Sequence, residues 1–129
     1  NPFTQTEAAT ICWETGVSTQ NRVGETGVYV TVNTNGAYIK IKGVDFGKQG
    51  AKNFLASVAG ATKGNAIELR LDNENGPIIG TLKVKSTGGA DKWVTQSCSV
   101  KMAKGVHDLY LKFTGGDGPL LNFDWWKFE

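Results

Sequence analysis

The side chains that could carry out catalysis are few in this chain. His107 is the only histidine. It falls on the same side of its strand-like segment as Leu109 and Leu111, so we expect a partly buried packing residue rather than a base. The spacings Cys-x-x-Cys, Gly-x-Ser-x-Gly and His-x-x-x-His are absent, which excludes the usual zinc and acyl-transfer sites. Two facing carboxylates could hydrolyse a glycoside, but the sequence does not indicate which acidic residues would pair. We therefore predict no catalytic residue.

The aromatic side chains favour a binding role instead. Segment 94–102 alternates as a strand, with Val94, Cys98 and Val100 on one face and hydroxyl or lysine side chains on the other. Trp93 falls on this second, polar face. The flat C–H face of a sugar ring packs on an indole, while its hydroxyls need amide or hydroxyl partners. Trp93 is therefore a candidate sugar platform; the alternative is that a neighbouring loop simply covers it.

Trp125 and Trp126 are adjacent in another strand-like segment. Neighbouring residues of a strand point to opposite faces. We therefore expect one of the two indoles to fill the core and the other to face outward or to lie under a loop.

Length and composition indicate one domain, residues 1–129. The chain is 40% hydrophobic and 20% charged, enough apolar material for a real core. Its 14 basic and 12 acidic residues are scattered along the chain, so neither nucleic acid nor a membrane is an expected partner. No apolar run approaches the roughly 18 residues of a membrane span.

The hydrophobic pattern indicates an all-β fold. Short segments in which apolar and polar residues alternate are separated by Gly-, Asn- and Asp-rich turns such as the one around Gly88 and Gly89, and no segment has the period of an amphipathic helix. Turns at such short, even intervals predict two packed antiparallel sheets, a β-sandwich of jelly-roll type. The expected strands are 37–41, 53–59, 66–71, 78–84, 94–102, 107–113 and the carboxyl-terminal segment from residue 121.

Cys12 and Cys98 are the only cysteines. In a small secreted β domain two cysteines usually pair, whereas in the cytosol they stay reduced. Cys98 shares a face with apolar residues, so a buried thiol is the alternative to a disulfide.

Several segments in a common order resemble carbohydrate-binding modules of family 6. The likeness covers nearly the whole chain and runs through EAATICWETG, NGAYIKIKGVDFG, IELRLDNENGPIIGTLKV, STGGADKWVT, GVHDLYLKFTGG and LLNFDWWKF. The sequence of these segments is similar to that of modules at the carboxyl end of bacterial arabinofuranosidases and xylanases. The resemblance implies a jelly-roll sandwich without catalysis. It also implies a secreted bacterial protein that binds plant cell-wall β-glycans, such as xylan, arabinoxylan or related xylo- and gluco-oligosaccharides, for an attached glycoside hydrolase.

The resemblance also implies particular site residues. Trp93 matches the family's stacking tryptophan, and Asn122 matches the asparagine that hydrogen-bonds the same sugar. The tyrosine that forms the second wall falls on Val32 here, and Tyr29 could replace it only if the strand is bulged or a loop is reshaped. Tyr38 matches the aromatic of a second family site on the concave sheet face.

The family's structural calcium is held by an acidic opening segment and by an aspartate of the last strand. Glu7 and Asp124 match these positions, whereas Ala9 replaces a second carboxylate of the opening segment. Calcium requires several oxygen ligands, so this substitution predicts a site that is weak, absent or rebuilt from backbone carbonyls.

Two other classes of function fit the same residues. A small glycoside hydrolase would need a facing carboxylate pair, and an adhesive domain would use its aromatic side chains to bind a protein. We prefer a glycan-binding module, and we expect a monomer.

Overall fold

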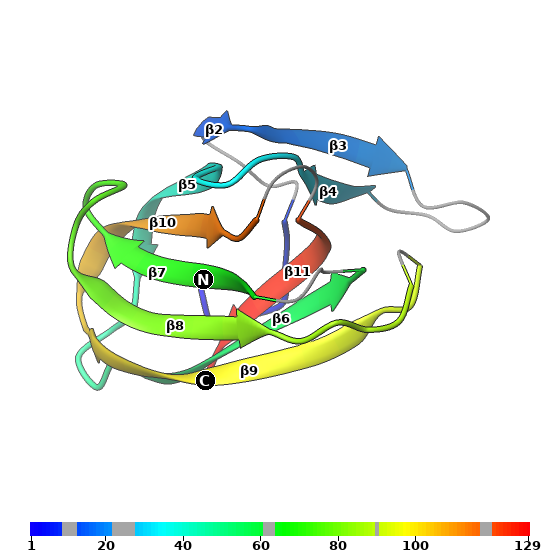
Figure 1. Cartoon of the computed structure of the whole chain (residues 1–129). Helices are drawn as coiled ribbons and strands as arrows, with labels where there is room; N and C mark the ends of the chain where they lie inside the picture. The colour runs from blue at the N-terminus through cyan, green and yellow to red at the C-terminus, as the bar shows by residue number, and fades with distance from the viewer. Residues whose placement is uncertain (9–12, 22–27, 61–63, 90, 117–119) are drawn as a thin grey trace.

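The described part of the chain is entirely β. The computed structural model describes residues 1–8, 13–21, 28–60, 64–89, 91–116 and 120–129, and only the backbone of residues 7, 13–15, 19–21, 28 and 102. These segments form two sheets without a helix (Figure 1). The described segments therefore contain no helix that could span a membrane. The strands are β1 (Thr6–Glu7), β2 (Trp13–Thr15), β3 (Val17–Asn21), β4 (Val28–Val32), β5 (Tyr38–Asp45), β6 (Ala51–Ala59), β7 (Asn65–Leu71), β8 (Ile78–Val84), β9 (Val94–Ala103), β10 (Val106–Thr114) and β11 (Leu121–Phe128).

The two sheets are antiparallel and face each other. One has the order β3-β4-β11-β6-β9, with β1 paired to the far part of β11, and the other has the order β2-β5-β10-β7-β8. Sequential strands often lie in different sheets, so the chain crosses repeatedly from one layer to the other. This arrangement confirms the predicted all-β, jelly-roll sandwich.

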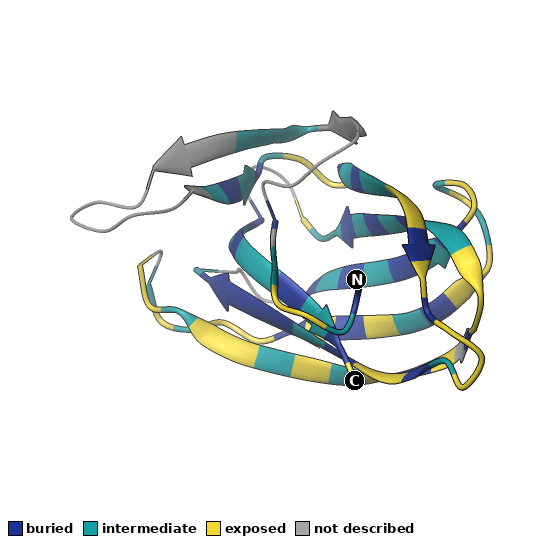
Figure 2. Ribbon diagram, turned by 180° about the vertical axis from the view of Figure 1, so that it is seen from behind, coloured by how far each residue is buried: buried dark blue, intermediate teal, exposed yellow. Residues whose placement is uncertain are grey.

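The period-two pattern of the sequence determines which side chains enter the core. In β7 buried and half-buried residues alternate along the whole strand, and β8 and β10 behave similarly (Figure 2). The predicted strands are all present, most with slightly different ends. The strands β1 to β4 were not predicted, because residues 1–36 are rich in Gly, Thr and Asn and their alternation is short.

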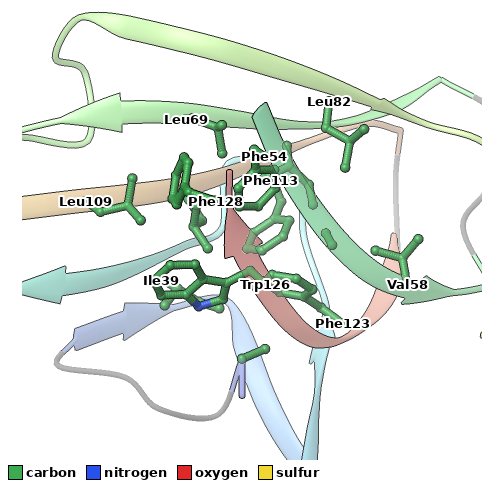
Figure 3. Packing of buried hydrophobic residues seen from close by; sticks show 14 of the residues in the cluster. Ile39, Phe54, Val58, Leu69, Leu82, Leu109, Phe113, Phe123, Trp126 and Phe128 are labelled. Carbon is green, nitrogen blue, oxygen red and sulfur yellow. The ribbon is translucent and has the colours of Figure 1, made fainter. Parts of the chain in front are cut away.

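Aromatic and aliphatic side chains of both sheets fill the space between them. Phe113 of one sheet meets Phe123 of the other edge to face, with ring centroids 5.8 Å apart. Figure 3 shows the same interdigitation for the surrounding side chains. Dense packing of this kind leaves little room for truncation of any member. The largest fully buried side chains include Ile39, Phe46, Phe54, Leu69, Leu109, Leu111, Phe113, Phe123 and Phe128.

Two amide hydrogen bonds join the sheets where β8 approaches β9. Gln96 accepts a hydrogen bond from the Lys85 N–H (2.8 Å) and donates one to the Lys85 carbonyl (2.9 Å), as a paired strand would. Further along the same seam, a side chain at Gly80 would place its Cβ 2.8 Å from the Ser99 carbonyl oxygen, so only glycine permits this approach.

Val94 does not pack inward, contrary to the sequence prediction. It is 45% exposed, although it has the same strand phase as the buried Val100. Gln96 is level with Lys85, the first residue after β8, so Val94 lies beyond the end of the facing strand. The alternation of β9 is as predicted, but in the described part of the chain the facing strand ends before it reaches Val94.

The adjacent tryptophans of β11 behave as predicted. Trp126 is 2% exposed and packs in the core, where its ring meets Phe128 at 5.8 Å (Figure 3). Trp125 is half-buried on the outer face of its sheet.

Candidate functional site

A row of cross-strand partners crosses the outer face of the six-stranded sheet. Ser18 pairs with Thr31, Thr31 with Asn122, and Asn122 with Ala59. If the β6–β9 register is continued by one residue, Trp93 lies opposite Ala59. Directly paired residues share a face of the sheet. The row therefore brings Asn122 and Trp93, the two residues carried over from the family resemblance, to the same surface.

Asn122 is held in place by its neighbour. The Thr31 hydroxyl donates a hydrogen bond of 2.9 Å to Asn122 Oδ1. Sequence reasoning missed Thr31, although its position two residues after Tyr29 placed it on the same strand face. This bond orients the Asn122 amide, whose N–H and C=O groups are the partners that sugar hydroxyls require.

Tyr29 reaches Trp93 across the sheet. Their ring centroids are 5.3 Å apart and the ring planes make an angle of 69°, an edge-to-face contact. Tyr29 belongs to β4, and Trp93 directly precedes β9. The strands β11 and β6, which carry Asn122 and Ala59, lie between β4 and β9, so the two rings meet across them. Both rings are half-buried, so part of each remains accessible.

The route by which Tyr29 reaches this surface differs from the expected one. The described β3–β4 and β4–β11 pairs run in regular register, so no bulge in them brings Tyr29 to this surface. Val32, the position expected to carry a wall tyrosine, is fully buried. Tyr29 differs from Val32 by an odd number of residues and so faces outward by simple alternation.

The loop that precedes Trp93 is held to the end of β6 by hydrogen bonds. The Gly60 N–H donates to the Thr87 hydroxyl (2.9 Å) and to the Gly89 carbonyl (2.9 Å), and the Thr87 N–H donates back to the Gly60 carbonyl (3.2 Å). Gly88 has a φ of +88°, a conformation that favours glycine. The predicted Gly88-Gly89 turn is therefore present, and it ties the loop to the end of β6.

The spacing of the two rings determines how a sugar could bind. Carbon atoms in contact lie about 3.5–4.0 Å apart, so a sugar ring between two parallel aromatic planes needs roughly 7 Å or more between them. Tyr29 and Trp93 touch each other, so in this structure Tyr29 is an adjoining wall and not a facing one. A pyranose would stack on the accessible face of one ring with the other at its side.

A second aromatic pair lies on the outer face of the five-stranded sheet. Tyr38 and Tyr110 are half-buried, with ring centroids 5.8 Å apart. As predicted, Tyr38 faces away from the buried Ile39. Lys40 Nζ lies 5.6 Å from the Tyr110 ring centroid, and a hydrogen bond with Tyr110 followed by the charge of Asp108 raises the pKa of Lys40. Sequence reasoning missed Tyr110, whose alternation with the buried leucines of its strand was the available signal.

The two candidate calcium ligands lie in neighbouring strands. Glu7 of β1 pairs with Trp125, and the Ala8 N–H donates a hydrogen bond of 2.7 Å to the Asp124 carbonyl. The Glu7 side chain and all of Ala9 are outside the described residues. Among the described side chains no group of three His, Cys, Asp or Glu could hold a metal ion.

The predicted cysteine pair is only half described. Cys98 is half-buried beside the core, and burial raises the pKa of its thiol. It forms no disulfide with any described cysteine. Cys12 lies outside the described residues, so the proposed bond stays a prediction.

His107 is partly buried, as predicted, but its partners are polar. Its Nδ1 lies 3.1 Å from Asp72 Oδ1 and its Nε2 lies 2.8 Å from the Lys104 carbonyl oxygen. A register shift between His107 and Leu109 separates the imidazole from the leucine row. His107 thus connects two turns instead of packing among the leucines.

Fold and site together define a β-sandwich binding domain whose outer surface suits sugar rings: a tryptophan, a tyrosine and an oriented asparagine on one sheet. The chain matches the family described as carbohydrate binding module (family 6) over residues 7–129, and it belongs to that family.

Relatives and solved structures agree with this assignment. An arabinoxylan arabinofuranohydrolase of Paenibacillus polymyxa is 47% identical over 133 residues, which cover 99% of this chain and 21% of that protein. A family 6 module of Clostridium cellulolyticum, solved with xylose, has a TM-score of 0.92 and 38% identity and covers 99% of this chain and 98% of that one. A glycoside hydrolase family 43 arabinoxylan arabinofuranohydrolase of Bacillus subtilis, solved with cellotetraose, has a TM-score of 0.92 and 42% identity and covers 98% of this chain and 27% of that one.

The curated relatives are much longer than this chain. It spans 21% of the Paenibacillus protein and 26% of the corresponding Bacillus subtilis protein. The matched region is therefore one part of those enzymes.

Proposed function

We propose that this chain is a non-catalytic module that binds plant cell-wall β-glycans, namely xylan, arabinoxylan and related xylo- or gluco-oligosaccharides. The observation that carries the proposal is the contact of Trp93 with Tyr29 beside the Thr31-oriented Asn122. In this arrangement an aromatic face packs on the sugar ring and an amide bonds its hydroxyls at the edge. The relatives solved with xylose and cellotetraose support the same ligand class.

We further propose that the module acts in the same polypeptide as a glycoside hydrolase, outside a bacterial cell. The arabinofuranohydrolases matched over a fifth to a quarter of their length support this arrangement. Binding through an exposed aromatic site is weak and reversible. An attached module of this kind raises the concentration of its enzyme at the polymer surface without adding a catalytic group.

Retardation in native gels tests the binding and the lack of catalysis together. We expect the purified domain to migrate more slowly in gels that contain soluble arabinoxylan or xylan than in gels without polymer, while bovine serum albumin is unaffected. Incubation with the same polymers should release no reducing sugar. Release of reducing ends would indicate a hydrolase, and unchanged migration with every β-glycan would favour a protein-binding domain.

We propose that any calcium in this domain binds at Glu7 and Asp124 and has a structural role. The adjacency of β1 and β11 supports the location. Two carboxylates cannot fill the six to eight oxygen positions of calcium, so backbone carbonyls would have to contribute the rest. The metal would then join the amino-terminal segment to the last strand.

A structural calcium should raise the melting temperature with increasing metal concentration and change sugar affinity little, because it would bind only the folded state. Differential scanning calorimetry with calcium, magnesium or chelator measures this effect, and Asp124→Asn should abolish the calcium-specific increase. An unchanged melting temperature in chelator would show that the site is absent. Loss of sugar binding in chelator without unfolding would contradict the structural role.

A further inference from the structure

The outer face of the five-stranded sheet has more cations than anions around its tyrosine pair. Lys40, Arg70 and Lys112 lie on this face, where the paired strands place them beside Tyr38 and Tyr110. The acidic side chains on the same rows are Glu68 and Asp108. The tyrosine pair is therefore set in a locally positive surface, although the whole chain has a net charge of only +2.

Two of these three cations are already paired with carboxylates. Arg70 donates to Glu68 Oε1 through Nε (3.2 Å) and Nη2 (3.0 Å), and through Nη1 to the Gly76 carbonyl (2.8 Å). Lys40 Nζ lies 3.7 Å from Asp108 Oδ2. These pairings account for both acidic side chains of the tyrosine rows.

Lys112 has no carboxylate partner among the described residues. Glu68 is its direct cross-strand neighbour but is bound by Arg70. Lys112 Nζ instead donates a hydrogen bond of 2.9 Å to the neutral Asn75 Oδ1 in the β7–β8 turn. This contact positions the ammonium group without pairing it with a carboxylate.

We propose that this face binds a carboxylate-bearing sugar, a uronic acid unit of a plant cell-wall glycan, with its ring on Tyr38 and Tyr110 and its carboxylate at Lys112. The inference rests on the proposed function, since it names the ligand class of a second glycan-binding surface. Tyr38 and Lys112 are direct cross-strand partners, so one sugar can contact both.

The two kinds of contact have separate roles at this face. The tyrosine rings provide apolar area to any pyranose, charged or neutral. An ammonium–carboxylate hydrogen bond is stronger than a neutral one and discriminates in favour of the acidic sugar. Lys40 lies beside the Tyr110 ring on the other side of the pair, and its hydrogen bond with Tyr110 raises its pKa.

Glucuronoxylan and its carboxyl-reduced form provide the test, because they share one backbone and differ in charge. We expect stronger gel retardation by the acidic polymer, by about three- to tenfold in apparent affinity, and loss of this excess on addition of salt. Lys112→Gln should abolish the excess, and Lys112→Arg should retain it. Lys101→Gln is the matched control, since this exposed lysine of β9 belongs to the other sheet.

Equal binding of the two polymers by the unmodified domain would overturn the inference. Equal losses in Lys112→Gln and Lys101→Gln would also overturn it, because they would reveal diffuse charge attraction. Trp93→Ala separates this inference from the proposed function: it should weaken binding of the carboxyl-reduced polymer and leave the acidic excess. If the carboxyl-reduced polymer fails to bind while glucuronoxylan binds through Lys112, the proposed neutral-glycan site is wrong and this inference stands.

Discussion

Replacing Trp93 by alanine should lower the affinity for xylan about tenfold or more and leave the domain folded. The indole is the largest apolar surface of the candidate site and is only half-buried. Aromatic stacking contributes roughly 1 kcal/mol beyond the burial of area, and about 1.4 kcal/mol corresponds to a tenfold change in affinity. Isothermal titration with xylo-oligosaccharides measures the loss, and thermal unfolding verifies the fold.

Three further variants identify which part of the aromatic pair matters. Trp93→Phe keeps a smaller stacking surface and should retain part of the affinity. Tyr29→Phe keeps the edge-to-face contact and should bind almost as well as the unmodified domain, whereas Tyr29→Ala removes the adjoining wall. Normal binding by Trp93→Ala would move the site to the Tyr38 face. Loss of both binding and stability would mean that Trp93 is a core residue.

Replacing Phe128 by alanine should destabilise the domain by about 3–5 kcal/mol, the usual cost of removing a fully buried phenylalanine. Its ring lies 5.0 Å from that of Phe46, 5.1 Å from Phe54 and 5.8 Å from Trp126, centroid to centroid. Its backbone N–H also donates to the Pro2 carbonyl (2.8 Å), so the residue connects the core to the amino-terminal segment. Urea unfolding monitored by tryptophan fluorescence measures the change.

Two controls determine whether the loss comes from packing. Phe128→Leu keeps most of the apolar volume and should cost clearly less than alanine. Val106→Ala removes methyl groups from a side chain that is 64% exposed and should change stability by no more than about 0.5 kcal/mol. A cost below about 1 kcal/mol for Phe128→Ala would show that the site collapses around the missing ring, contrary to the dense packing described above.

Family membership follows from the match over residues 7–129 and from the fold of the solved modules. The roles of Trp93, Asn122, Tyr29 and Tyr38 are proposals, and the variants above test those of Trp93 and Tyr29. Trp93 and Tyr29 are in contact and belong to one surface, so substitutions of either ring test the same candidate site.

Local periodicity was sufficient to determine the strand face of several site and core residues, where no bulge interrupts the alternation. It predicted the outward phase of Trp93, the opposite directions of Trp125 and Trp126, and the outward Tyr38. The reason is physical: side chains alternate along any strand, whatever its neighbours are. The absence of the usual catalytic spacings could likewise be read from the sequence alone.

Tertiary structure alone decided which outward residues meet. Tyr29 belongs to β4 and Trp93 directly precedes β9, and β11 and β6 separate these two strands, so no local pattern predicts the contact of the rings. The exposure of Val94 depends on where the facing strand ends, and the Lys112–Asn75 contact depends on the position of the β7–β8 turn. Strand order and strand ends are set by packing of the whole sandwich, whereas alternation is a property of each strand by itself.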